Sequence, residues 1–274
     1  MLCKPKKAGG LSIHDLMAWN CAAMAKYVWN IAEKADCLWV KWVYYVYIRD
    51  TDWWSYTPPT STSWHWRSIC KVREKVASGY RGNSWIHNPR GIYSVKSRYE
   101  WLRGEMVSVS WQRWVWCRFN IPKHSFICWL NALGRLNTKS RLLLLGVSND
   151  DRCIIYDADS ESTSHLFFEC AFSRECLKAT KRWLSISCTS MQYETLCKWI
   201  ARRKASKFKK NVLYAAVNAC LYNVWRARNE GYWNQKIPSI ETTVKVIQEQ
   251  VKIRVRAIMP KLISATDKSW FDSC

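Results

Sequence analysis

Residues 153–170 read CIIYDADSESTSHLFFEC and contain three side chains of the kinds that bind zinc in proteins. Cys153 opens the stretch, His165 begins an apolar run, and Cys170 ends that run. The spacing from His165 to Cys170 resembles the spacing in small zinc modules. The stretch therefore predicts a zinc site. The alternative is a pair of buried thiols beside a histidine at the start of a helix.

One position in this stretch departs from a complete zinc site. A second thiol normally follows the first in a Cys-x-x-Cys loop, but that position holds Tyr156, whose phenol has a pKa near 10 and is a poor ligand at neutral pH. The remaining candidates for a fourth ligand are Asp157, Asp159, Cys176 and water. Three protein ligands plus water is also the pattern of a catalytic zinc, although a damaged structural site is the simpler interpretation.

The surrounding sequence predicts a mainly α-helical fold. The chain has 274 residues, of which 49% are apolar and 19 are tryptophan, so it can bury a substantial core. Apolar residues recur at spacings of three and four in most segments. The runs WIH and IYSV flank the turn sequence NPRG at 88–91, which predicts a small β-hairpin within 84–95. An irregular loop carrying Cys153 is expected at 148–164.

Capping residues help to place the helices. Pro122 suits a helix start, Thr138 suits an N-cap, and Gly231 is expected to break a long helical pattern that includes the charged run 198–210. The predicted helices cover 11–31, 66–76, 94–102, 122–133, 138–146, 165–184 and 240–262. Two lobes are expected, the first packing residues 11 to about 80 and the second the remainder. The last helix carries an apolar stripe from Ile240 to Leu262, which can pack in the core or dock a partner helix.

The charge of the chain predicts a polyanionic partner. Lys and Arg number 43 against 21 Asp and Glu, which gives a formal net charge of +22. Such an excess favours nucleic acid or an anionic membrane surface. No run approaches the roughly 20 apolar residues of a membrane span, so we expect RNA or DNA and no membrane. The expected phosphate contacts are Lys4, Lys6, Lys7, Arg202, Arg203, Lys204, Lys207, Lys209, Lys210, Arg226 and Arg228.

The cysteines indicate a reducing compartment. There are 13, an odd number, and no apolar stretch of a secretory signal follows the basic start of the sequence. We therefore expect mostly free thiols and a nuclear or cytoplasmic, non-secreted protein. The sequence predicts no oligomeric state.

Several blocks in order resemble a known family. They are KKAGGLSIHDLMAWNCAAMAKYVWNI (6–31), GIYSVKSRYEWL (91–102), WCRFNIPKHSFICWLNALGRLNTKSRLLLLGV (116–147), the stretch 153–170, and VWRARNEGYW (224–233). Together they resemble the region downstream of the polymerase in plant non-LTR (LINE-type) retrotransposon reverse transcriptases, including its zinc-binding domain. The resemblance covers roughly residues 4–235.

The resemblance implies roles for parts of the chain. The family's ligands fall on Cys153, His165 and Cys170, and its second ligand falls on Tyr156, where this sequence differs. The departure fits a decaying copy of such an element. The implied division is a helical region downstream of the polymerase core (1–80), a zinc-binding-like domain (81–200) and a basic helical extension (201–274).

No catalytic residues are predicted. The sequence YDAD at 156–159 superficially resembles the paired carboxylates of a polymerase, but it lies in the Cys/His loop without an apolar strand on each side. We therefore expect a non-enzymatic, nucleic-acid-binding fragment without a polymerase core, or a translated remnant with no selected role. A structural or protein-interaction helical domain is the alternative.

Overall fold

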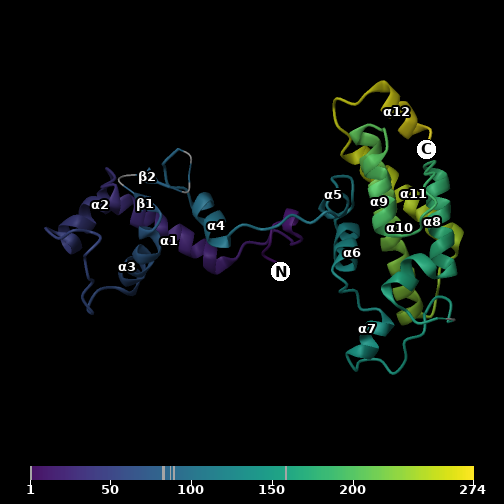
Figure 1. Ribbon diagram of the computed structural model, residues 1–274, viewed down its shortest axis with the longest axis horizontal. Coiled ribbons are helices and arrows are strands. Elements are labelled where there is room, and N and C mark those ends of the chain that lie inside the picture. The colour runs from purple at the N-terminus through teal and green to yellow at the C-terminus, as the bar shows by residue number, and fades with distance from the viewer. Residues whose placement is uncertain (1, 82–83, 87, 89, 158) are drawn as a thin grey trace. The chain divides into compact units, whose positions relative to one another are not determined.

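The computed structural model describes residues 2–81, 84–86, 88, 90–157 and 159–274. Helices dominate these residues, and the strands named among them form one short antiparallel pair (Figure 1). The predicted mainly α fold with a small hairpin is confirmed. None of the described helices combines the length and the apolar character needed to cross a bilayer.

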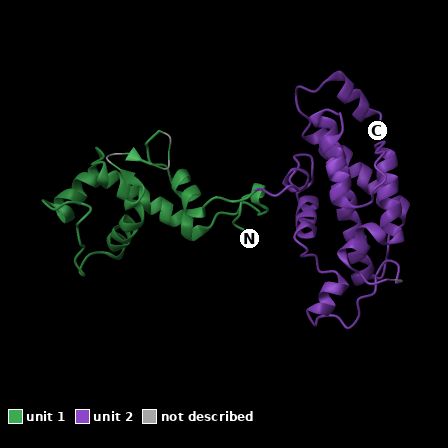
Figure 2. Cartoon of the chain, in the orientation of Figure 1, with its two compact units in different colours: residues 1–107 green, residues 108–274 purple. Residues whose placement is uncertain are grey.

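The chain forms two compact units, Met1–Val107 and Ser108–Cys274 (Figure 2). The first is longer than the lobe expected to end near residue 80, because α4 (Val95–Arg103) packs against α1 (Leu16–Ala32). Trp85 and Tyr93 also belong to the core of the first unit. The division by role into 1–80, 81–200 and 201–274 stays a prediction.

The first unit is built from helices around an aromatic core. A short 3-10 turn (Lys6–Ala8) and α1 are followed by α2 (Leu38–Val43), a π-helical turn (Tyr44–Ile48), α3 (Trp64–Ala77) and α4. Asp15 caps α1 by accepting hydrogen bonds from the backbone N–H groups of Met17 and Ala18. Such caps satisfy backbone donors that have no partner inside the helix. Three tryptophans lie in the core, which are Trp53, Trp66 and Trp85.

The hairpin lies earlier in the chain than the sequence predicted. Strand β1 (Tyr80–Arg81) pairs with β2 (Ser84–Trp85), with Tyr80 opposite Trp85. In the expected turn at 88–91, the Gly91 N–H donates a hydrogen bond to Asn88 O. Pro89 of that turn, and His87 of the expected first strand, lie outside the described residues. The expected second strand, 92–95, does not form, because the Tyr93 side chain enters the core and donates to Ala22 O.

The second unit is organised around one long helix. Helix α10 (Lys207–Asn234) has 28 residues, which at 1.5 Å per residue is about 42 Å. Around it pack α5 (Gln112–Val115), α6 (Pro122–Ala132), α8 (Ala171–Trp183), α9 (Tyr193–Arg202) and α11 (Ile240–Ala257). The unit also contains α7 (Lys139–Leu144), a π-helical turn η3 (His165–Glu169) and α12 (Ala265–Asp272). Most residues of α10 between Val212 and Arg228 are buried, so this helix forms the centre of the unit.

Several predicted helices begin or end elsewhere, and the one expected over 11–31 begins at Leu16. The helix expected over 165–184 is interrupted at Cys170, whose backbone is extended with ψ 132°. The charged run is divided between α9 and α10, and Gly231 lies inside α10 and does not break it. Helix α11 ends at Ala257, and three residues of its stripe are buried, which are Ile247, Val251 and Val255. This part of the stripe packs in the core, where α11 contacts α10 and α8.

Candidate metal centre

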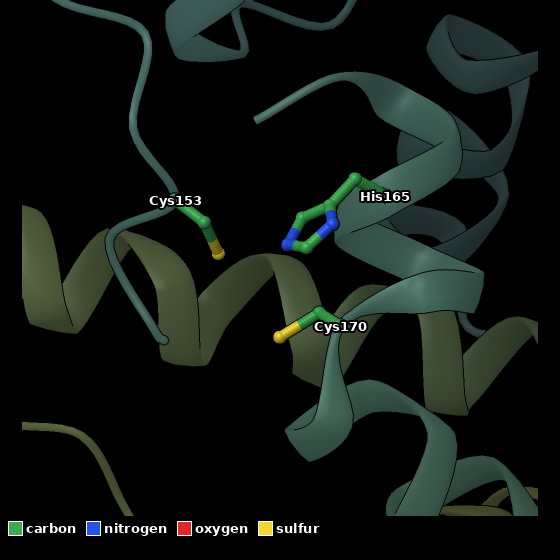
Figure 3. Close-up of side chains that lie close together, drawn as sticks. All are labelled: Cys153, His165 and Cys170. Atoms are coloured by element: carbon green, nitrogen blue, oxygen red, sulfur yellow. The ribbon is translucent and has the colours of Figure 1, made fainter. Parts of the chain in front are cut away.

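The structure brings Cys153, His165 and Cys170 together (Figure 3). Cys153 lies in the loop after α7, His165 begins the π-helical turn η3, and Cys170 is the N-cap of α8. All three are buried, and one potential ligand atom of each lies within 4.8 Å of the other two. A tetrahedral zinc site with Zn–S of about 2.3 Å and Zn–N of about 2.0 Å places its ligand atoms roughly 3.5–3.8 Å apart. Only small side-chain movements would convert the observed arrangement into such a site.

Backbone hydrogen bonds point at both sulfur atoms. The N–H groups of Ile155 and Tyr156 hydrogen-bond to the sulfur of Cys153, and those of Phe172 and Ser173 to the sulfur of Cys170. The second pair lies at the N-terminus of α8, where the helix dipole also favours negative charge. Both positions are therefore prepared for thiolate sulfur, which is the form that binds a metal.

The two thiols share a hydrogen bond. It lowers the pKa of Cys170 to about 6, because the Cys153 thiol donates to its sulfur, and it raises the pKa of Cys153 well above the ordinary thiol value. Cys170 is therefore the more acidic thiol of the two, and a divalent cation that bound both sulfur atoms would displace the shared proton.

The histidine is oriented toward the same point. In Figure 3 the ring nitrogen remote from the backbone, Nε2, faces the two sulfur atoms. Nε2 of His165 is buried and has no hydrogen-bond partner among the described residues. The other nitrogen, Nδ1, lies 3.7 Å from a carboxylate oxygen of Asp159. The buried Nε2 that faces the two sulfur atoms without a hydrogen-bond partner among the described residues is a suitable nitrogen ligand, so the donor set fits zinc.

The fourth position has no acidic, thiol or imidazole ligand in the described part of the chain. The cluster of such ligands ends at three residues, so neither Asp157 nor Cys176 completes it, and Asp159 approaches the far nitrogen of His165. The Tyr156 side chain is 59% exposed. Tyr156 therefore contributes its backbone N–H to Cys153 and presents its phenol to solvent. The three residues predicted as ligands thus lie together, and their role as ligands stays a prediction.

The loop that carries Cys153 is held by backbone contacts. Cys153 N–H donates to Asp159 O and Asp157 N–H donates to Cys153 O, both at 2.8 Å. Asp157 has a φ of 47°, a left-handed conformation that Asp tolerates better than most residues. Arg152 and Ser160 form an antiparallel bridge that closes the loop. The position of the Cys153 sulfur is thus fixed by local backbone geometry.

Two residues that sequence reasoning did not assign to the site attach this loop to α10. Glu161 is fully buried and pairs with Arg228, at 2.8 Å between Oε1 and Nη2. Gly231 allows Ile154 to approach α10, because a Cβ at Gly231 would lie 3.1 Å from Ile154. The Gly in a helical pattern was an available sequence signal, because such a glycine usually has a packing reason, whereas a Glu in a polar loop gives no sign that it is buried.

The predicted phosphate contacts are not equivalent in the structure. Arg228 is 3% exposed and is paired with Glu161, so it is not available to a phosphate. Arg226 is exposed and pairs with Glu230 within α10. Lys209 lies 3.9 Å from Asp267 and over the ring of Trp270. The remaining residues are exposed or partly exposed, and they are Lys4, Lys6 and Lys7 in the first unit and Arg202, Arg203, Lys204, Lys207 and Lys210 in the second.

The segment that holds the cluster is similar to known proteins. The family model "zinc-binding in reverse transcriptase" matches residues 93–176, which include Cys153, His165 and Cys170. A protein of Arabidopsis thaliana named "Putative ribonuclease H protein At1g65750" is 34% identical over 89 residues, which are 31% of this chain and 14% of the relative. The chain thus spans about a seventh of that relative's length. No solved structure matches the chain. Together these findings support a retroelement-derived protein with a segment of the reverse-transcriptase zinc-binding type.

Proposed function

We propose that this chain is a nucleic-acid-binding module of a plant LINE-type retrotransposon protein, and that it works without a polymerase active site or other catalytic centre of its own. The observation that carries the proposal is the buried cluster of Cys153, His165 and Cys170 inside the matched segment. The net charge of +22 supports a polyanionic partner.

In this proposal Cys153, His165 and Cys170 hold zinc, with water at the fourth position. When bound, zinc supplies a structural cross-link. The residues that it joins come from the loop after α7, the turn η3 and the start of α8. The affinity is expected to be lower than that of a four-ligand site, because residue 156 contributes no thiolate.

The cations at the end of α9 and the start of α10 would contact phosphates. Arg202, Arg203, Lys204 and Lys207 are exposed, and they form no ion pair among the described residues. Each neutralised phosphate releases condensed counterions, so the affinity should fall steeply with salt.

The test measures zinc content and nucleic-acid binding on the full chain. Purified protein should hold zinc near one equivalent at saturating metal, and Cys153→Ser should lose it. Cys37→Ser is the matched control, because Cys37 is exposed and lies in the other unit. Labelled oligonucleotides should bind in 50 mM salt and dissociate as salt rises. Equal zinc retention in the two variants, or no oligonucleotide binding at low salt, would contradict the proposal.

The alternative of a helical protein-interaction domain has less support. Its main sequence feature was the stripe on α11, and Ile247, Val251 and Val255 of that stripe are buried against the second unit's own helices. These three residues are therefore not free to receive a partner helix.

A further inference from the structure

A cleft of about 930 Å³ lies in the second unit, away from the three metal-type ligands. One wall comes from α5 and the residues after it, another from the end of α9 and the first turns of α10, and a third from residues that follow α11. The volume lies in the upper range of clefts that hold small organic ligands. None of the sequence predictions joined these three segments in one site.

The cleft is lined by cations and by no carboxylate. Arg113 and Arg118 approach it from the α5 side, and Lys207 and Lys210 approach it from α10. None of these four side chains forms an ion pair among the described residues. Lys210 donates to the backbone oxygen of Ala201 at 2.8 Å, which holds its charge beside the cleft. Four cations without counter-charges favour an anionic ligand.

The start of α10 adds to this positive potential. Helix N-termini normally carry acidic residues, because the helix dipole is positive there. The first turn of α10 has no acidic residue and instead carries Lys207, Lys209 and Lys210. Asp267 accepts a hydrogen bond from the Ser206 cap and lies 3.9 Å from Lys209. Lys207 and Lys210, by contrast, have no ion-pair partner among the described residues, so a phosphate in the cleft would supply negative charge beside them.

Aromatic side chains supply the remaining surface of the cleft. Phe119, Phe208 and Tyr214 are buried and form its floor. Trp116 also lines the cleft and is partly exposed, with its Nε1 buried. A cationic groove with an accessible aromatic face is the combination that binds unpaired nucleotides, whose bases stack while their phosphates are neutralised.

We propose that this cleft is a binding site for single-stranded nucleic acid, in which Arg113, Arg118, Lys207 and Lys210 contact phosphates and Trp116 stacks on a base. The inference rests on the proposed nucleic-acid-binding function and adds the strand type and the location. A duplex would place its phosphates in the cleft without offering a free base face to Trp116.

The test compares two double variants of the full chain that lose the same charge. Arg113→Gln with Arg118→Gln removes two cations of the cleft. Arg174→Gln with Arg182→Gln removes two exposed arginines of α8 that do not line the cleft. Fluorescence anisotropy is measured with 12-nucleotide oligo(dT), oligo(U) and a 12-base-pair duplex over a salt series. The four substituted arginines are all exposed, so both double variants should fold like wild type, and circular dichroism checks this.

The cleft pair should reduce the slope of log K against log salt for the single strands by about 1.4, at about 0.7 per lost phosphate contact. The α8 pair should leave that slope close to wild type. Trp116→Ala should weaken single-strand binding about 5- to 150-fold with little change for the duplex. A preference for oligo(U) or for oligo(dT) identifies the sugar, and either supports the site.

The experiment distinguishes failure of the cleft proposal from failure of the proposed nucleic-acid-binding function. If wild type binds single strands and the cleft pair binds them as the α8 pair does, the cleft is not the site, although the proposed function stands. If wild type binds no oligonucleotide at low salt, the proposed function fails together with the cleft. If Trp116→Ala does not fold, the two arginine pairs still decide the outcome.

Discussion

The guanidinium of Arg228 donates hydrogen bonds to both oxygens of the buried Glu161 carboxylate. Nε lies 3.0 Å from Oε1 and 3.2 Å from Oε2, and Nη2 lies 2.8 Å from Oε1. The same carboxylate accepts hydrogen bonds from the backbone N–H groups of Lys139 at 2.9 Å and Ile154 at 3.4 Å. Glu161 thus joins the start of α7, the loop next to Cys153 and the C-terminal third of α10. Nearly every lone pair of a buried carboxylate is used, which is the condition under which such a pair stabilises a fold.

The first prediction follows from this pair. Glu161→Gln leaves the buried Arg228 charge without a counter-ion, so we expect a loss of about 3–5 kcal/mol in the free energy of unfolding. Glu230→Gln is the matched control, because it removes the partner of Arg226 from a surface pair and should cost at most about 1 kcal/mol. Urea unfolding followed by circular dichroism measures both. Equal effects of the two substitutions would show that the Glu161 pair has no special structural role.

Zinc affinity should respond to residue 156. Tyr156→Cys places a second thiol in this loop, at the last position of a Cys-x-x-Cys sequence that begins at Cys153. Two N–H groups of the same loop already hydrogen-bond to the Cys153 sulfur. We expect zinc to bind at least about tenfold more tightly, because a fourth thiolate replaces water. Competition with a colorimetric chelator measures the affinity. Tyr45→Cys, which adds an exposed thiol in the first unit, controls for adventitious binding. Unchanged affinity in Tyr156→Cys would mean that another residue already completes the site.

The close approach at Gly231 predicts a packing effect. A Cβ there would lie 3.1 Å from both Ile154 and Ile237, so Gly231→Val should force these neighbours apart and cost about 1–3 kcal/mol. In a unit of this size such a loss lowers the melting temperature by roughly 2–4 °C per kcal/mol.

Shortening the neighbour tests the same contact from the other side. In an Ile154→Ala background, part of the Gly231→Val effect should disappear, because the side chain that the valine meets is smaller. Strictly additive effects of the two changes would argue against direct contact between these positions.

Stability should fall in mild acid because of His124. Burial, together with the neighbouring Lys123, lowers the pKa of His124 to about 3. The ring stacks on Tyr222 with centroids 4.5 Å apart, and its Nε2 has no hydrogen-bond partner among the described residues. Between pH 6.5 and about 3 the unfolded chain therefore binds a proton that the folded chain does not bind, so stability decreases as pH falls through that window.

We expect this histidine alone to account for a measurable loss of stability in mild acid. Wild type should lose about 2 kcal/mol between pH 7 and pH 5 from this histidine, and His124→Gln should lose less. Chemical denaturation at the two pH values measures the difference. His65→Gln, at an exposed position, should behave like wild type. A pH dependence that is unaltered in His124→Gln would assign the acid sensitivity to other groups.

Local chemistry was sufficient to predict much of the fold from sequence. Pro122 at a helix start and Thr138 at an N-cap depend on neighbours a few residues away, and α6 and α7 begin where they indicated. The periodicity in 11–31 predicted α1, which begins five residues later, at Leu16, after the Asp15 cap. The hairpin was placed too late because the apolar run 92–95 reads equally well as a strand, and only the core decides that Tyr93 points into it.

The amino-acid sequence by itself determined the helical class and the surplus of positive charge, and it singled out Cys153, His165 and Cys170 as candidate ligands, with Tyr156 where a fourth is expected. The tertiary structure alone decided which cations remain on the surface, because burial of Arg228 depends on Glu161, 67 residues away along the chain. It also decided that Arg113, Trp116 and Lys207 share one cleft. The physical reason is that helix formation is set by neighbouring residues, whereas pairing of charges and assembly of a site depend on contacts between segments that only the packed chain brings together.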